Sequence, residues 1–363
     1  MKPNLLSHHK QQGLSLVELL VALAISSTLL LGMSSIYLDS RKTDKLGTAL
    51  SRIQETGRFA IDFLAKDLRM AGYSGCMDPE SITLEVNALN VPNTTPPATS
   101  QFDLALRGFE VDDNTWADAQ EFNNTAIETR ALVGSDVIAI QRASVAGITT
   151  TADMGANNAA VPITANPLGF AQNDLVIIAS CETADMFRIS NTPVGTIAHA
   201  QAGFNSTDTF SMPYNTGSTV MFFESVAYFV ANTGRTNARG DAINALYRQT
   251  DNLVNNATPD FTIDELVEGV DSLQILYGER LAGGNIHYLP ADQVTDMTTV
   301  ESIRLGVLVS SIDRVQEADD NLSYELPGET IGPVGGAGVV VSHPVDQRIR
   351  RDFSTTINIR NRL

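Results

Sequence analysis

An uninterrupted apolar run near the N-terminus constrains this chain more than any other feature of its sequence. Residues 14–38 read LSLVELLVALAISSTLLLGMSSIYL, and Glu18 and Tyr37 are the only ionisable side chains among them. At about 1.5 Å per residue, a helix of this length crosses the roughly 30 Å hydrocarbon core of a bilayer. The preceding residues include Lys2 and Lys10 but no acid, whereas the charges after the run nearly balance. This bias predicts a cytoplasmic N-terminus, with the rest of the chain outside.

Two simple interpretations of this segment leave something unexplained. A cleaved secretory signal has an apolar region of about 7 to 15 residues and a small-x-small cleavage site, and this run is longer and lacks that site. A plain signal anchor explains the length and the charge bias. It does not explain Glu18, because a carboxylate inside an apolar span costs up to about 2.5 to 3.5 kcal/mol and usually has a partner.

Residues 13–20, GLSLVELL, resemble the processing site of type IV prepilins and pseudopilins. The shared pattern is a polar basic leader, a glycine, a hydrophobic residue, and a glutamate at the fifth place of the mature chain. The resemblance implies that prepilin peptidase removes the leader, residues 1–13, by cutting between Gly13 and Leu14, and then methylates the Leu14 amine. Leu14 stands where phenylalanine is most common. In a bundle of such helices, the Glu18 carboxylate can pair with the terminal ammonium of a neighbouring subunit. The low dielectric constant of the bundle core strengthens the attraction between the two charges.

The helix predicted from Leu14 continues beyond the apolar run. The next proline is Pro79, and the text up to Ala71 is rich in helix formers. We therefore expect residues 14–40 to form a transmembrane or filament-core half and residues 41–71 an amphipathic half, with the end at residues 72–75, GYSG. The predicted apolar stripe is Leu46, Leu50, Ile53, Gly57, Ala60, Leu64, Leu68 and Ala71. Phe59, Phe63 and Met70 fall on the opposite side, where we expect the globular domain to cover them in preference to another subunit.

Residues 72–363 are expected to form a globular domain of antiparallel sheets, because strand-like segments follow one another without alternating helices. The fold class is therefore α+β and pilin-like, with the long N-terminal helix packed on a β-rich domain. A short helix is expected at 262–268, TIDELVE. The predicted strands are 103–108, 136–142, 174–180, 219–231, 243–249, 273–278, 302–310 and 353–360.

The chain has 2 cysteines, Cys76 and Cys181, both in the part predicted to lie outside the inner membrane. A pair of cysteines in an oxidising compartment most simply forms a disulfide. The enclosed loop of about 100 residues would contribute up to roughly 4 to 5 kcal/mol in the chain-entropy model. Two distant cysteines supply too few ligands for a metal site.

A closer resemblance, to PilW-type minor pilins, appears in segments from both ends and the middle of the chain. These segments are GLSLVELLVALAISS at 13–27, RMAGYSGC at 69–76, LVEGVDSLQILYG at 266–278, SIRLGVLVS at 302–310 and FSTTINIRNRL at 353–363. The resemblance implies a subunit that waits in the inner membrane and then joins other minor pilins in a complex that primes pilus assembly and caps the tip, often beneath a large adhesin. Its implied partners also include the major pilin, prepilin peptidase and the inner-membrane assembly platform.

Two other functions stay open at this point. A J-type pseudopilin of type II secretion shares the architecture, and a membrane-anchored periplasmic binding protein or enzyme shares the anchor. We expect no enzyme and no cofactor, because the sequence holds no G-x-S-x-G, HExxH or P-loop motif. The formal net charge of −18 argues against nucleic-acid binding.

The remaining polar motifs receive ordinary interpretations. The acidic stretch 110–121 lacks the ligand spacing of an EF-hand, so no metal is expected. His199, His287 and His343 have no motif around them and are expected at the surface or in loops. Arg239, Gly240 and Asp241 spell a tripeptide used by some adhesive proteins, but turn chemistry explains it. The C-terminal arginines are expected to line a solvated strand edge, with contact to an acidic neighbour as the alternative: Arg348, Arg350, Arg351, Arg360 and Arg362.

Overall fold

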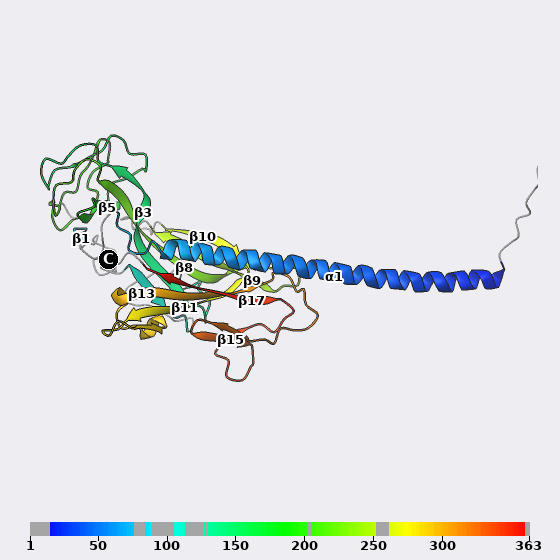
Figure 1. Cartoon of the computed structure of the whole chain (residues 1–363). Coiled ribbons are helices and arrows are strands. Elements are labelled where there is room, and N and C mark those ends of the chain that lie inside the picture. The colour runs from blue at the N-terminus through cyan, green and yellow to red at the C-terminus, as the bar shows by residue number, and fades with distance from the viewer. Residues whose placement is uncertain are drawn as a thin grey trace, which may run out of the picture. The chain divides into compact units, whose positions relative to one another are not determined.

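A computed structural model describes residues 15–75, 84–88, 105–112, 127, 129–201, 205–251 and 261–359. The chain divides into two compact units, Met1–Ala49 and Leu50–Leu363. The helix α1 (Leu16–Leu68) begins in the first unit and ends in the second (Figure 1). The predicted long helix is therefore confirmed, and it ends three residues before Ala71 because residues 69–72 form a turn.

The strands of the second unit form four sheets within the described residues. The largest has the order β1-β6-β5-β8-β3-β2, and β9 joins β10 to β8; its strands are β1 (Glu85–Val86), β2 (Leu106–Phe109), β3 (Val137–Thr149), β5 (Leu175–Ala179), β6 (Ala184–Arg188), β8 (Thr219–Thr236), β9 (Ala242–Asp251) and β10 (Phe261–Glu268). The second has the order β12 (Ile286–Leu289), β11 (Val270–Arg280), β13 (Val300–Ser310) and β17 (Arg350–Asn358). Smaller sheets pair β14 (Tyr324–Leu326), β15 (Glu329–Pro333) and β16 (Val341–His343), and β4 (Val161–Pro162) with β7 (Thr196–Ile197). Two short 3₁₀ helices, η2 (Ala291–Gln293) and η3 (Met297–Thr299), precede β13.

The predicted antiparallel architecture is confirmed, with β1–β6 and β15–β16 as parallel pairs among the described strands. Each of the predicted strands overlaps an observed one. The helix predicted at 262–268 is wrong, because these residues form β10 and pair with β9 along its length. Tertiary pairing overrides helix propensity here, and Ile263 packs on the large sheet. The sequence did not indicate β6, β12 or the small sheet of β14–β16.

The C-terminal part of α1 shares one hydrophobic core with the two larger sheets. Ile53, Ala60, Leu64 and Leu68 are buried against side chains of β2, β3, β8 and β9 on one side and of β11, β13 and β17 on the other. This confirms the predicted stripe from Ile53 onward, whereas Leu46 at its N-terminal end is exposed. An apolar stripe of this kind gives a helix most of its stability in a protein, because packing outweighs propensity.

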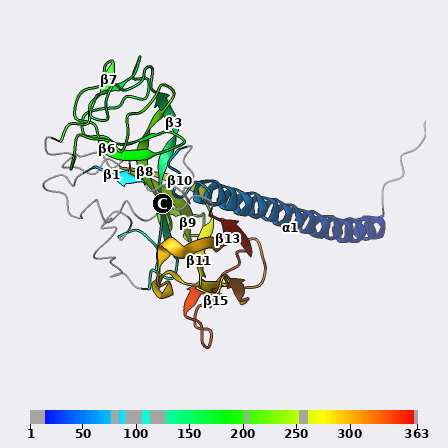
Figure 2. The same cartoon turned by 60° about the vertical axis from the view of Figure 1, so that its left-hand side comes forward.

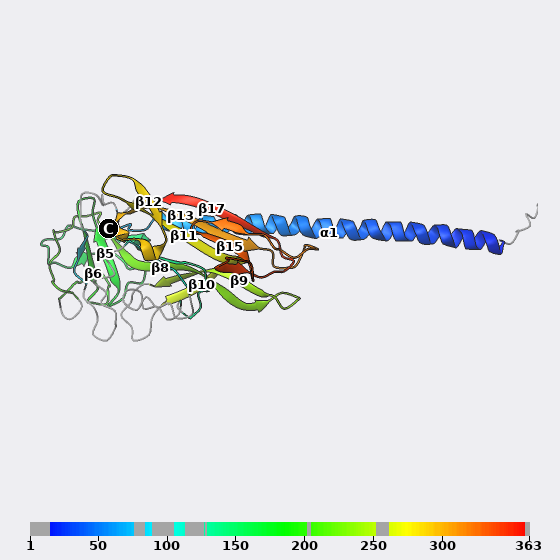
Figure 3. The ribbon, with the colours of Figure 1, turned by 90° about the horizontal axis from the view of Figure 1, so that it is seen from below.

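Gly57 permits the closest approach between α1 and a strand. A Cβ atom built on Gly57 would overlap the ring of Phe353 on β17, so the helix and this strand fit together only without a side chain at that position. Figures 1 and 3 show β17 beside the C-terminal part of α1. Gly47 lies in the same helix, yet a Cβ atom there would meet no atom within 4 Å.

These two glycines give a matched pair of substitutions. Gly57→Ala is expected to lower the free energy of unfolding by about 1 to 2 kcal/mol, because the half-buried Phe353 ring must move. Gly47→Ala is expected to raise it by up to about 1 kcal/mol through helix propensity. Chemical unfolding of the full-length protein in detergent micelles measures both changes. A Gly57→Ala variant as stable as Gly47→Ala would show that β17 does not need the close approach.

The opposite face of the helix differs from the prediction. Phe59 and Phe63, one turn apart, are 49% and 39% exposed, and only Met70 is half-buried. The expectation that the globular domain covers these two phenylalanines is therefore wrong. The sheets enclose one face of α1 only, because the core that they share with the helix already contains its stripe of small and aliphatic side chains.

Polar contacts fix the end of α1 on the large sheet. The hydroxyl of Tyr228 on β8 donates to Asp67 at 2.5 Å, and Arg142 on β3 lies 3.4 Å from the same carboxylate. Arg142 also pairs with Glu224 at 3.0 Å. All of these groups are largely buried, so removing one partner would leave an uncompensated charge.

Residues 148–220 have a hydrophobic core of their own, which we call the second core. Its buried side chains come from β5, β6 and β8 and from the long loops between them, and they include Phe170, Phe187, Phe210 and Tyr214. Figure 2 shows these loops, in green, gathered beyond the ends of β3 and β8. Asp185 on β6 anchors the loop residues, because its buried carboxylate accepts hydrogen bonds from Tyr214 at 2.7 Å and Ser211 at 2.6 Å.

Candidate functional site

The first turn of α1 holds Glu18 in a capping box. The Ser15 backbone N–H donates to Glu18 Oε2 at 3.0 Å, and the Val17 N–H donates to Ser15 Oγ at 3.4 Å. A glutamate three residues after a serine N-cap satisfies N–H groups that have no partner inside the helix. Glu18 therefore has a partner within its own chain, which the sequence analysis missed although Ser15-x-x-Glu18 carries the capping-box signature. Gly13 and Leu14 lie outside the described residues.

The N-terminal part of α1 presents apolar side chains that no other described part of the chain buries. The helix contains an 18-residue window of mean hydropathy 2.2, and none of that window is buried. Its polar hydroxyls are satisfied locally, since Ser27, Thr28 and Ser35 each donate to the carbonyl three residues earlier at 2.8–2.9 Å. A helix with satisfied backbone and side-chain groups and an apolar surface suits a bilayer or a bundle of similar helices.

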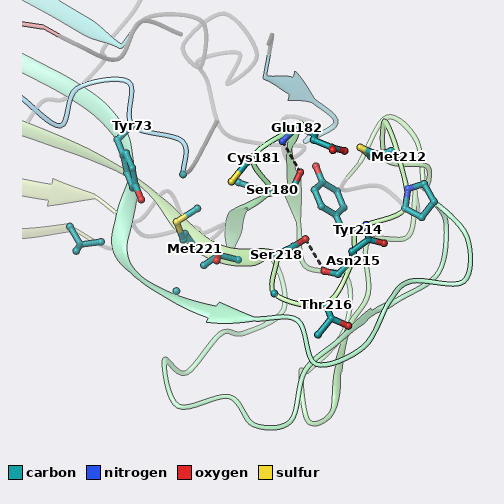
Figure 4. Close-up of a pocket in the computed structure, with 17 residues that line it drawn as sticks. Tyr73, Ser180, Cys181, Glu182, Met212, Tyr214, Asn215, Thr216, Ser218 and Met221 are labelled. Carbon is teal, nitrogen blue, oxygen red and sulfur yellow. Dashed lines mark hydrogen bonds between the residues drawn. The ribbon is translucent and has the colours of Figure 1, made fainter. Parts of the chain in front are cut away.

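Cys181 lies at a hollow where the turn after α1 approaches the β5–β6 hairpin. Gly75 and Cys181 both line this hollow of about 660 Å³, which Figure 4 shows with Tyr73 and Met221 on the facing side. A Cβ atom built on Gly75 would lie 2.7 Å from Cβ of Ala179. The residue before Cys76 therefore lies against the strand that precedes Cys181. Cys76 itself lies outside the described residues, so the disulfide stays a prediction.

The C-terminal arginines differ from the solvated edge that the sequence suggested. Arg350 is fully buried, and its guanidinium contacts Asp320 at 2.9 Å, Asp346 at 2.9 Å and Asp271 at 3.3 Å. Arg348 is also buried and donates to Asp346 at 2.7 Å. The surface interpretation is wrong for these two arginines, because buried aspartates from separate segments hold them inside the protein; it holds for Arg351, which is exposed. Arg360 and Arg362 lie outside the described residues.

The histidines were expected at the surface or in loops, and only His343, which is buried in β16, contradicts this; His199 lies in a loop but is not at the surface. His199 is buried, stacks on Phe210 with 3.8 Å between ring centroids, and shares a hydrogen bond with the Ala159 carbonyl. Burial lowers its pKa, although nearby acids oppose this effect. His343 is buried between the carbonyls of Leu322 and Pro344. His287 is exposed, as predicted.

Where the structure describes the remaining motifs, their residues have ordinary structural roles. Asp241 of the Arg-Gly-Asp tripeptide follows a turn with Gly240 at φ 85° and forms an ion pair with Arg314, as turn chemistry predicted. Within the described ranges, no group of three histidines, cysteines or acids could hold a metal ion. Most of the acidic stretch 110–121 lies outside them.

Comparisons with known proteins agree with this arrangement. Residues 8–34 match the prokaryotic N-terminal methylation motif, and residues 227–361 match the type IV pilus-assembly protein W family. No curated protein and no solved structure matches the chain. A long apolar helix that opens with a methylation motif and ends against antiparallel sheets defines a pilin-like protein, anchored in a membrane by that helix.

Within this class, the two matches support a type IV pilus minor pilin of the PilW type. The matched range 227–361 covers the second half of β8, β9, β10 and the whole four-stranded sheet. The whole of the second core, residues 148–220, lies before this range. The family matches thus indicate a structural pilin subunit, and the residues of the second core lie outside the matched ranges.

Proposed function

We propose that this chain is a minor pilin that prepilin peptidase processes between Gly13 and Leu14 and that takes part in priming and capping a type IV pilus. The observation that carries the proposal is the methylation motif at the start of a helix whose apolar surface is not covered by any described part of the chain. Such a surface needs a bilayer before assembly and a bundle of similar helices afterwards.

The orientation and the partners follow from the same proposal. The leader lysines Lys2 and Lys10 support a cytoplasmic N-terminus and a periplasmic β-rich domain from residue 72 onward. Assembly then moves the protein from the inner membrane to the pilus at the cell surface, beside other minor pilins, the major pilin and, in the complex at the tip, an adhesin. The exposed Phe59 and Phe63 belong to this proposal as a contact with a neighbouring subunit.

The first test is the intact mass and the N-terminal peptide of the protein isolated from its native membranes. A chain that begins with N-methylated Leu14 supports a prepilin-peptidase substrate. An uncut chain in cells with active peptidase would contradict the proposal and favour an anchored periplasmic binding protein or enzyme. Deleting the gene then separates the two assembly roles, because loss of pili fits a minor pilin and loss of protein secretion fits a J-type pseudopilin.

Glu18 variants test the pairing with the terminal ammonium of a neighbour. Glu18→Ala is expected to leave cleavage and folding intact but to lower incorporation into filaments at least about tenfold, the ratio that corresponds to 1.4 kcal/mol. Glu18→Gln is the decisive variant, because glutamine retains the capping box and loses the charge. Quantitative immunoblots of sheared pili measure incorporation.

The control for these variants is Glu55→Ala, which removes an exposed glutamate from the same helix. Glu55→Ala should incorporate normally. If Glu18→Gln also incorporates normally while Glu18→Ala does not, Glu18 acts through its helix cap and the intersubunit pairing is wrong.

A further inference from the structure

Glu110 and Asp136 bring two carboxyl groups together between the two larger sheets. Glu110 directly follows β2, and Asp136 directly precedes β3. Side chains alternate along a strand, so Asp136 faces the same side as Ile138 and Ile140, which belong to the core shared with α1. Asp136 is accordingly buried, with 4% of its surface exposed.

The turn before β3 covers part of the edge of β11. β12 pairs with β11 only from Tyr277 to Arg280. N-terminal to Tyr277, the turn before β3 lies along this edge of β11 in place of β12. The Asp136 N–H donates to the Leu273 carbonyl at 2.8 Å, and the Ile275 N–H donates to Asp136 Oδ2 at 2.6 Å. Ser135 Oγ accepts from the Leu273 N–H at 3.1 Å. Asp136 therefore links the large sheet to the four-stranded sheet.

Glu110 reaches the same place from the other side. Its Oε1 accepts from the Ala291 N–H at the start of η2, at 2.9 Å. The antiparallel register pairs Phe109 of β2 with Val137 of β3, so Glu110 and Asp136 lie opposite each other at the next step. Two carboxylates offer acceptors only, so a hydrogen bond between them requires one proton. Burial raises the pKa of both groups, and the charge of Glu110 raises the pKa of Asp136 further.

Among the described residues, the other groups that face the pair are neutral or acidic. Tyr277 on β11 is fully buried beside the pair, its hydroxyl has no hydrogen-bond partner among the described residues, and its ring fills the space over Gly108 of β2. Acidic neighbours come from the remaining elements: Asp112 after β2, Asp292 in η2 and Glu329 in β15. Arg107 on β2 alternates to the opposite face of that strand from Gly108.

We propose that Glu110 and Asp136 share one proton and form a pH-sensitive latch between the large sheet and the four-stranded sheet. With the proton present, the pair joins the end of β2, the start of β3, β11 and η2 through hydrogen bonds. When the proton leaves, two negative charges face each other in a buried space with acidic neighbours, and the latch opens where the turn covers β11.

The direction of the pH effect follows from linkage. At pH values above the ordinary pKa of a carboxyl group, the folded protein still holds the shared proton, whereas the unfolded chain has released it. The stabilisation is therefore complete below the ordinary carboxyl pKa and is lost as the pH rises through the raised pKa of the folded state. Between these values the folding equilibrium constant falls by up to about tenfold per pH unit.

The test compares wild-type protein with Asp136→Asn, full length in detergent micelles, by chemical unfolding from about pH 5 to 9. Asparagine keeps the shape of the protonated acid and can donate to Glu110. Asp136→Asn should gain stability relative to wild type as the pH rises, by up to about tenfold in the folding constant per pH unit. Hydrogen exchange should show the 270–280 segment opening with pH more steeply in wild type than in the variant.

Matched controls separate this latch from other titrations. Asp313→Asn changes an exposed aspartate and should keep the wild-type pH dependence. His199, whose lowered pKa gives the opposite slope near its ordinary pKa, is present in all variants and cancels in the comparison. If Asp136→Asn does not fold, Glu110→Gln gives the same comparison. A difference between wild type and the folded variant that stays constant over the pH range would overturn the proposal.

Discussion

Replacing Arg350 with methionine is expected to lower the free energy of unfolding by about 3 to 5 kcal/mol, the cost of removing one partner from a buried ion pair. Methionine keeps much of the aliphatic volume but none of the charge. The change would leave Asp271, Asp320 and Asp346 without the positive charge between them, and all three carboxylates are buried or nearly so. These aspartates come from β11, the loop before β14 and the loop before β17, so the guanidinium holds separate segments together.

The pH dependence of this variant supplies a second readout. Burial works against the charge of Asp346, but hydrogen bonds and the charge of Arg350, with help from Arg348, outweigh burial and lower its pKa. A lowered pKa contributes stability above the ordinary aspartate pKa, and this contribution is lost as the pH falls through the lower value in the folded state. The difference in the free energy of unfolding between wild type and Arg350→Met should therefore become smaller in acid, where Asp346 takes up a proton.

Arg351→Met is the matched control, because Arg351 is the next residue of the same strand and is exposed. It is expected to change stability by less than about 0.5 kcal/mol. Denaturant midpoints of the full-length proteins in detergent micelles measure both variants. Equal losses for the two substitutions would show that the buried network contributes little.

Replacing Cys181 with serine is expected to lower the free energy of unfolding by up to about 4 to 5 kcal/mol, the value that chain entropy gives for a closed loop of about 100 residues. The contact between Gly75 and Ala179 supports a cross-link at this point, because it holds the turn after α1 against the hairpin that carries Cys181. The cross-link would fasten the residues of the second core to the end of the helix.

The pairing of the two cysteines makes a stricter prediction than the loss of stability. Cys76→Ser and Cys181→Ser should lower the free energy of unfolding by the same amount. The double variant should lower it no further than either single variant, since both substitutions remove the same bond. Alkylation of the unfolded, unreduced wild-type protein should label no thiol. Labelling of both cysteines without a reductant, or additive losses in the double variant, would contradict the disulfide.

The strands and buried charges of the second core were the part of the fold hardest to predict from the sequence. Buried strands such as 174–180 were found because β-branched residues mark them, yet β6, Ala184–Arg188, contains Asp185 and Arg188 and does not read as a buried strand. The partners of Asp185 are Asn87, Ser211 and Tyr214, up to about a hundred residues away. A buried charge of this kind depends on long-range partners, which local patterns do not contain.

The sequence alone determined the features that depend on neighbouring residues. The apolar run after Gly13, the glutamate at its fifth place and the 3.6-residue stripe from Ile53 to Leu68 are local patterns, so the membrane helix, its buried face and the resemblance to PilW-type minor pilins could be predicted from them. Strand positions followed in the same way from composition. Two-residue and 3.6-residue periodicities are properties of the backbone and need no tertiary context.

Only the tertiary structure decided which polar groups are buried and which apolar ones are not. It placed Arg350 among three aspartates, turned 262–268 into an edge strand, left Phe59 and Phe63 exposed, and placed Glu110 opposite Asp136 at the end of β2 and the start of β3. The physical reason is that the free energy of a buried charge depends on what the rest of the chain brings within hydrogen-bonding distance. That distance is set by how the sheets pack, and a local sequence pattern does not specify it.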